Sequence, residues 1–133
     1  MISLNQYMRK FKYLVVLAGN SISGRLCTFL AHSGAVILLQ MTDMNYHFTL
    51  RIKPYVHYVP LTFTGADLLE KIQWLRDNDD KARQIARNGR NFGLSFLRLE
   101  DYYCYTSYVL HQFGQVTDKS ALIPFQQTEK IVL

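Results

Sequence analysis

The stretch from Phe11 to Gln40 constrains the fold more than any other part of this sequence. Phe11–Leu17 is rich in aromatic and β-branched residues, which is typical of a strand buried on both faces. An amphipathic helix is predicted next, and its apolar face consists of Ile22, Leu26, Phe29 and Leu30. Ala35–Leu39 then forms a second apolar strand. Because a helix between two such strands is a crossover connection, we expect the two strands to pair in parallel.

The turn between the first strand and the helix has the features of an anion site. Gly19 interrupts the strand and allows a ligand to approach the backbone. Ser21 or Ser23 can cap the helix, and Gly34 is predicted to end it in a left-handed conformation. Free N–H groups and the helix dipole then point at one spot. Arg25 lies in the first turn, where a cation destabilises a helix by about a few tenths of a kcal/mol. A phosphate bound there would make the contribution of Arg25 favourable. The turn therefore predicts a ligand that contains a diphosphate.

The spacing of the turn excludes some nucleotide sites. Gly19 and Gly24 are spaced as in a P-loop, but Arg25 and Leu26 follow where a P-loop has Lys and Ser or Thr. No hydroxyl is therefore placed to hold Mg²⁺, which argues against ATP or GTP hydrolysis, and the dinucleotide pattern G-x-G-x-x-G is absent. The alternative is an ordinary strand-to-helix loop with a surface arginine.

The rest of the chain predicts one more strand and three helices. Tyr55–Leu61 is the third short strand, and Pro60 marks its end or a sheet edge. One helix is predicted from an apolar stripe with helical spacing, formed by Leu68, Leu69, Ile72 and Leu75. The next helix begins at Asp77–Asp80, and its packed face consists of Ala82, Ile85, Ala86, Gly89, Phe92 and Phe96. Leu99–Phe113 is an aromatic helix that we expect Gly114 to end. This order describes an α/β fold, one half of a doubly wound parallel sheet, in which ligands bind at the carboxyl ends of the strands.

The predicted organisation is a polar lead over residues 1–10, a Rossmann-like α/β domain over residues 11–114 and a tail over residues 115–133. The 133 residues suffice for one core, and a net charge of +5 favours anionic ligands. No contiguous basic run is present, so the helix with Lys81, Arg83, Arg87 and Arg90 is interpreted as a solvated face and no nucleic-acid partner is expected. Cys27 and Cys104 are predicted to be buried free thiols. We expect no signal peptide in Met1–Lys10 and no membrane span in the chain.

Seven strings occur in an order that is similar to one known family. They are FKYL (11–14), GNSISGR (19–25), SGAVILLQ (33–40), KPYVHYVPL (53–61), EKIQW (70–74), IARNGRNF (85–92) and EDYYCY (100–105). Together they resemble the C-terminal half of the capsule-associated, Rumi-like glycosyltransferases, which include protein O-glucosyltransferases and fungal xylosyltransferases. The resemblance covers Phe11–Phe113 and rests chiefly on KPYVHYVPL.

The resemblance implies a GT-B type enzyme of two Rossmann-like domains, of which this chain supplies the one that binds the UDP-sugar donor. It implies inverting transfer to a protein or glycan hydroxyl without a metal or other cofactor, in the endoplasmic reticulum or Golgi lumen. The UDP-sugar site that it implies consists of Gly19, Asn20, Ser21, Ile22, Ser23, Gly24 and Arg25. In the family the residue at Arg25 contacts the diphosphate, where it would stabilise the leaving group.

The sequence departs from the family pattern in three places. The family usually carries Asn or Asp near Val16, Asp or Arg at Ala18, and an acidic residue near Tyr46. The N-terminal domain, which supplies the aspartate taken as catalytic base, is absent, so no catalytic residue is assigned and we expect a fragment or a truncated copy. Two other readings stay open: a non-catalytic remnant that at most binds a nucleotide, and a basic anion- or nucleic-acid-binding module.

Two further motifs have structural interpretations that we prefer to catalytic ones. Asp77-Asn78-Asp79 spells the D-x-D signature of metal-dependent glycosyltransferases, but its place at a helix start favours capping. His57 lies in the third strand string, and we interpret it as a hydrogen-bonded structural histidine.

Overall fold

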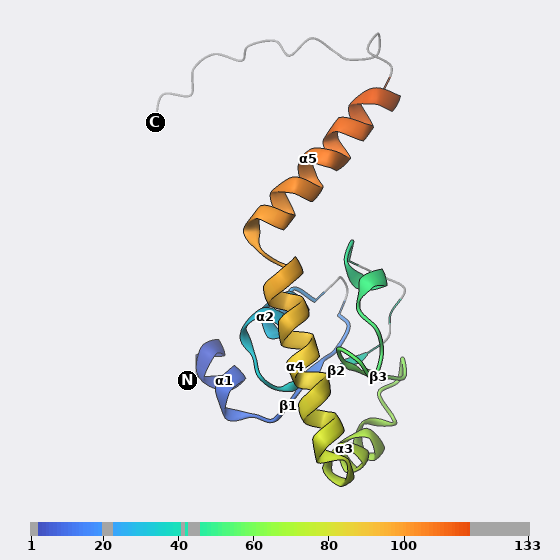
Figure 1. The fold of residues 1–133 in the computed structure, drawn as a ribbon. Coiled ribbons are helices and arrows are strands. Elements are labelled where there is room, and N and C mark those ends of the chain that lie inside the picture. The colour runs from blue at the N-terminus through green and yellow to red at the C-terminus, as the bar shows by residue number, and fades with distance from the viewer. Residues whose placement is uncertain (1–2, 20–22, 41, 43–45, 118–133) are drawn as a thin grey trace. The chain divides into compact units, whose positions relative to one another are not determined.

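The computed structural model describes residues 3–19, 23–40, 42 and 46–117 (Figure 1). Contacts divide the chain into two compact units, residues 1–98 and residues 99–133, and each unit is described by itself. The first unit contains the sheet and the candidate site.

The first unit is built on a three-stranded parallel sheet in the order β1-β2-β3. The strands are β1 (Tyr13–Val16), β2 (Val36–Gln40) and β3 (Val59–Leu61). The predicted fold class, a Rossmann-like α/β half with a short parallel sheet, is therefore confirmed. The third strand is shorter than predicted, because Tyr55 has a left-handed φ of 57° and the chain turns there before β3 begins. Pro60 lies in an edge strand, as predicted.

Helices cover both faces of the sheet, as the alternation of side chains along the strands requires. On one face, α2 (Arg25–His32) packs against β1 and β2. The core of this face includes Leu14, Val16, Ile37, Leu39, Leu26, Phe29 and Leu30. On the other face lie α3 (Leu68–Asp77) and the start of α4 (Asp79–Phe96), with a core of Val36, Leu38, Val59, Leu61, Leu75, Ala82 and Ile85 (Figure 1).

Two glycines allow α4 to lie directly on the backbone of other elements. A Cβ at Gly89 would stand 2.6 Å from the His57 carbonyl oxygen, and a Cβ at Gly93 would stand 2.5 Å from the Leu30 carbonyl oxygen. Gly89 belongs to the packed face predicted for this helix, and its contact confirms that prediction at this residue. Gly93 escaped the sequence analysis because it adds no side chain to the apolar pattern.

Helix ends differ from the predictions in two places. The polar lead over residues 1–10 was predicted without a secondary structure, and it contains a helix, α1 (Leu4–Lys10), with a capping box between Ser3 and Gln6. Gly34 is not left-handed, and among the described glycines only Gly65 has a positive φ, of 68°. The end of α2 is closed instead by Ser33, whose N–H and hydroxyl both donate to the Phe29 carbonyl at 3.0 and 2.7 Å. A short 3₁₀ helix, η1 (Thr49–Arg51), follows β2.

The second unit consists of one described helix, α5 (Leu99–Val116). The prediction that Gly114 ends this helix is wrong, because the helix continues through it to Val116. The predicted burial of Cys104 is wrong, because this residue is exposed. The aromatic residues of the helix are exposed as well: Tyr102, Tyr103, Tyr105, Tyr108 and Phe113. Among the described residues, no helix is both long and apolar enough to cross a membrane.

Candidate functional site

The carboxyl ends of the three strands are joined by a single side chain, Gln40. This residue ends β2, and its Oε1 accepts a hydrogen bond from the Ala18 N–H at 2.8 Å. Its Nε2 donates to the Phe63 carbonyl, beyond the end of β3. The loops after β1 and β3 are thereby held beside the end of β2. The sequence predicted no role for Gln40 in the site, because nothing in the sequence shows that one amide reaches both neighbouring strand ends.

The turn after β1 provides the described part of the predicted UDP site: Gly19, Ser23, Gly24 and Arg25. The predictions for Asn20, Ser21 and Ile22 lie outside the described residues. An added Cβ at Gly19 would meet no atom of the described residues within 4 Å, so these residues leave the backbone there open.

The prediction was that Ser21 or Ser23 caps α2. No side chain among the described residues caps its start, so Ser23 is not the cap, and Ser21 lies outside the described residues. Gly24 is the N-cap residue, and the Ser23 carbonyl accepts the Leu26 N–H at 3.1 Å. The Ser23 hydroxyl instead accepts from Arg25 Nε at 3.2 Å. This bond occupies the hydroxyl with the arginine rather than with the helix N–H groups.

Arg25 lies in the first turn of α2, as predicted; it is the first residue of this helix, and it is exposed. The first turn of α2 holds no acidic residue, and among the described residues no carboxylate forms an ion pair with Arg25. The cation therefore adds to the positive end of the helix dipole instead of offsetting it. Such a helix start favours a bound anion at this edge of the sheet.

Tyr46 stands beside this turn. Its hydroxyl oxygen lies 4.0 Å from the position of a Cβ at Gly24, and its ring stacks on Phe48 with centroids 5.1 Å apart. Burial raises the pKa of Tyr46, with a smaller contribution from the hydrogen-bonded Cys27, and burial likewise raises the pKa of the half-buried Cys27 thiol. Both groups thus stay neutral near pH 7. An aromatic hydroxyl stands where the family pattern leads one to expect a carboxylate.

The other two departures from the family pattern have structural roles here. Val16 is only 2% exposed and belongs to the core, so its side chain faces away from any ligand in solvent. Ala18 offers its backbone N–H to Gln40.

His57 is a structural histidine, as predicted. Its Nδ1 accepts the Lys53 N–H at 2.9 Å, and its ring lies 5.4 Å from the ring of Phe92. Burial and, secondarily, the charge of Lys53 lower the pKa of His57, so the ring is neutral at pH 7 and can accept that bond.

The acidic residues of the D-x-D string are held by neighbouring side chains. Asp79 pairs with Lys12 and Arg83, and Asp77 accepts from Gln73 at 2.9 Å. Asn78 holds the N-cap position of α4, but its side chain donates to the Trp74 carbonyl of α3 instead. Within the described ranges, no three His, Cys, Asp or Glu residues cluster as metal ligands do.

A parallel sheet with helices on both faces defines a Rossmann-like half, and the candidate site is the basic helix start at its carboxyl edge. The chain matches the family model described as Glycosyl transferase family 90 over residues 2–131, and it belongs to this family. The resemblance seen in the sequence is therefore confirmed.

Curated relatives of this chain include three protein O-glucosyltransferases. Protein O-glucosyltransferase 3 of Homo sapiens is 31% identical over 122 residues, which is 86% of this chain and 24% of that protein. Protein O-glucosyltransferase 2 of Danio rerio is 32% identical, and the match covers 80% of this chain and 21% of that protein. Protein O-glucosyltransferase 1 of Rattus norvegicus is 30% identical, and the match covers 80% of this chain and 27% of that protein. The chain thus spans about a quarter of the length of these relatives.

Proposed function

We propose that this chain is the donor-binding part of a glycosyltransferase that uses a UDP-sugar, most simply UDP-glucose or UDP-xylose, and acts on a hydroxyl of a protein or glycan. The observation that carries the proposal is Arg25, an exposed cation without an acidic partner among the described residues, at the start of the helix that follows β1. Family membership supports the activity class. The named relatives are O-glucosyltransferases, which supports a protein acceptor.

In the proposed mechanism, the diphosphate of the donor lies against Gly19, Ser23, Gly24 and Arg25. Negative charge develops on the UDP leaving group as the sugar departs, and Arg25 together with the helix N–H groups stabilises it. This is the work that a metal ion does in other glycosyltransferases, so the proposed transfer is independent of metal. That the transfer is inverting is proposed from the family resemblance alone. The proposal places the catalytic base in a further domain of a GT-B enzyme, and the reaction in the endoplasmic reticulum or Golgi lumen.

A second candidate is a non-catalytic member of the family that at most binds a nucleotide. It is favoured by Val16 and Ala18, since a buried aliphatic side chain and a methyl group stand where the family pattern leads one to expect polar groups. The departures at Val16 and Ala18 would affect contacts with the sugar or the ribose of the donor, whereas Arg25 would contact its diphosphate.

The test is a calorimetric titration of the purified chain with UDP and, separately, with UMP. We expect Arg25→Ala to weaken UDP binding about tenfold, the loss expected for one charge-assisted hydrogen bond. UMP binding should change little, because UMP lacks the second phosphate. Chelator and added Mg²⁺ should leave the UDP affinity unchanged.

The matched control is Arg87→Ala, which removes the same charge from an exposed site on α4. An equal loss with this variant, or an equal loss for UMP, would contradict the proposed diphosphate contact. A folded chain that binds no UDP would reject the proposed donor site as well as the nucleotide-binding form of the second candidate.

A further inference from the structure

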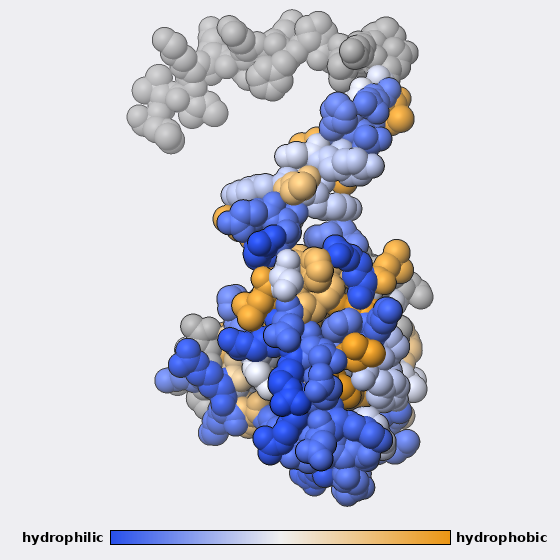
Figure 2. All heavy atoms as spheres, in the orientation of Figure 1, coloured by the Kyte–Doolittle hydropathy of each residue, from blue (hydrophilic) through white to orange (hydrophobic). Residues whose placement is uncertain are grey.

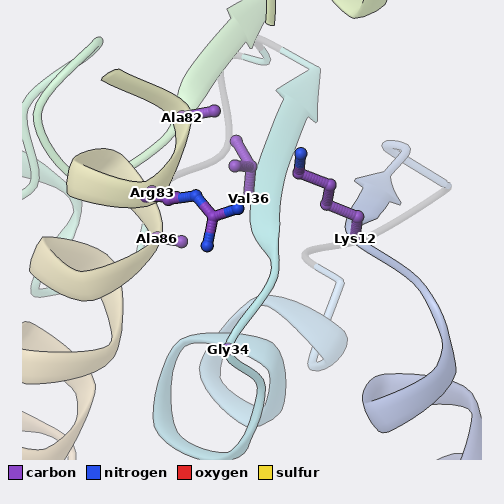
Figure 3. A pocket seen from close by; sticks show the side chains of 6 residues that line it. All are labelled: Lys12, Gly34, Val36, Ala82, Arg83 and Ala86. Atoms are coloured by element: carbon purple, nitrogen blue, oxygen red, sulfur yellow. The ribbon is translucent and has the colours of Figure 1, made fainter. Parts of the chain in front are cut away.

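A second concave region lies at the opposite edge of the sheet from the proposed donor site. It is an open groove of about 550 Å³, lined by residues just before β1 and β2, by the last turn of α1 and by α4. A smaller pocket of about 310 Å³ adjoins it and shares Lys12 and Gly34 with it. Figure 3 shows the smaller pocket, where Arg83 extends from α4 toward Val36 and Lys12 stands on the far side of β2.

Five basic side chains line these two hollows, which together we call the basic groove. They are Arg9, Lys10, Lys12, Arg83 and Arg90. They come from α1, from the segment before β1 and from α4, so the fold rather than the sequence brings them together. Figure 2 shows hydrophilic side chains gathered over α1 and along α4 on this face.

The positive charge of the groove is only partly neutralised. Among the described residues, the carboxylate paired with these cations is Asp79, which both Lys12 and Arg83 contact. Asp80 also acts electrostatically on Arg83 without pairing closely with it. Two negative charges therefore face five positive ones, in a chain whose formal net charge is +5. The dipole of α1 accounts for Arg9 and Lys10 in its last turn, but it does not account for Arg90.

Arg90 is directed over the groove by a contact of its own. Its Nη1 donates to the Ser33 carbonyl at 3.4 Å, next to the lining residues Gly34 and Ala35. This anchors one end of a guanidinium group, a planar fork that binds phosphate oxygens in pairs. On the other side Lys10 lies over the ring of Phe11, 5.8 Å from its centre, so part of the lining is apolar.

We propose that the basic groove is a second anion site, separate from the donor turn, that binds a ligand carrying clustered phosphate groups. Its volume lies in the range of small-molecule sites, roughly 300–1,000 Å³. Cations clustered at one short groove suit a compact multivalent anion better than a polynucleotide, which needs an extended basic stripe. The two sites lie at opposite ends of α2: Arg25 is its first residue, and His32, which lines the groove, is its last. They are therefore separated by the length of this helix, roughly 10 Å.

The test titrates inorganic tripolyphosphate into the chain at low salt, with and without Arg25→Ala to disable the donor turn. We expect binding that survives Arg25→Ala and weakens about tenfold in Arg9→Gln and in Arg90→Gln. Arg87→Gln is the matched control, because it removes the same charge from α4 outside the groove, and it should change the affinity less than about twofold. Asp79→Asn should tighten binding, because it removes the one paired carboxylate. Arg9, which is exposed, keeps the test valid if Arg90→Gln lowers the melting temperature.

A vesicle arm identifies the source of the phosphate groups. Binding to phosphatidylcholine vesicles that contain phosphatidylinositol bisphosphate, lost in Arg9→Gln and Arg90→Gln but absent with phosphatidylserine, would support the site and assign it to a lipid headgroup. Binding of tripolyphosphate alone would support the site and assign it to a free ligand. No binding in either arm, an equal loss in Arg87→Gln, or tighter binding of oligonucleotides with increasing length would overturn the proposal.

Discussion

The packing of α4 on α2 can be tested with one added methyl group, in the variant Gly93→Ala. A Cβ at this position would stand 2.5 Å from the carbonyl carbon and oxygen of Leu30 and 2.6 Å from the nitrogen of Ala31. Ordinary contacts of a Cβ begin near 3.4 Å, so the two helices must separate by about 0.9 Å here. The atoms met are backbone atoms, which no change of rotamer can move away.

The expected magnitude follows from two opposing terms. Overpacking a core usually costs about 1–3 kcal/mol, and the upper end applies because the neighbours are backbone. Replacing glycine by alanine inside a helix returns about 1 kcal/mol. We therefore expect Gly93→Ala to lower the free energy of unfolding by about 2 kcal/mol. With a urea m-value of about 1–3 kcal/mol/M for a small protein, the midpoint should fall by about 1 M.

The assay is urea unfolding followed by circular dichroism, with Asn91→Ala as the control. Asn91 is exposed on the same helix, so this variant changes helix propensity without touching α2 and should raise the midpoint slightly. If Gly93→Ala raised the midpoint as Asn91→Ala does, the propensity term alone would account for both, and the close contact of α4 with the Leu30 carbonyl would be refuted.

Three further variants test other contacts. Tyr13→Phe removes a buried hydroxyl that has no hydrogen-bond partner in the described part of the chain. Thermal melting should therefore show a free energy of unfolding about 1 kcal/mol higher than that of the wild type. The control is Tyr55→Phe, which loses the hydrogen bond from Lys71 and should show no such gain. Gln40→Leu removes both bonds that join the strand ends and should cost about 1–3 kcal/mol in urea unfolding, together with a weaker affinity for UDP. Hydrogen bonds from Lys12 and Arg83 hold the pKa of Asp79 below its ordinary 3.8, so its contribution to stability is present above pH 3.8 and is lost as the pH falls through the lower folded value. The urea midpoint of Asp79→Asn should accordingly lie below that of the wild type at pH 7 and converge with it in acid. The control is Asp80→Asn, in the same helical turn, whose midpoint should differ less from the wild type as the pH changes. If the difference for Asp79→Asn stayed constant with pH, the pairing would be refuted.

The strand-helix-strand unit was predictable because its signal is local. Apolar runs of strand length, a helical stripe between them and a glycine turn each state a structure within a few residues, and β1, α2 and β2 form as expected. The position of Arg25 in the first turn of α2 was predictable for the same reason. The ends of elements were not: Ser33 rather than Gly34 closes α2, because a hydroxyl that bonds back to a carbonyl competes with a left-handed glycine and the sequence does not show which one prevails.

The sequence by itself thus determined the fold class, the family and the basic start of the helix after β1, all of which follow from residue order and short-range periodicity. Only the tertiary structure decided that Gln40 ties three strand ends together, that α4 lies on the Leu30 backbone at Gly93, and that Arg9 and Arg90 line one groove. These contacts join residues far apart in the chain. Whether such groups meet depends on the packing angles of whole elements, which no local pattern of residues encodes.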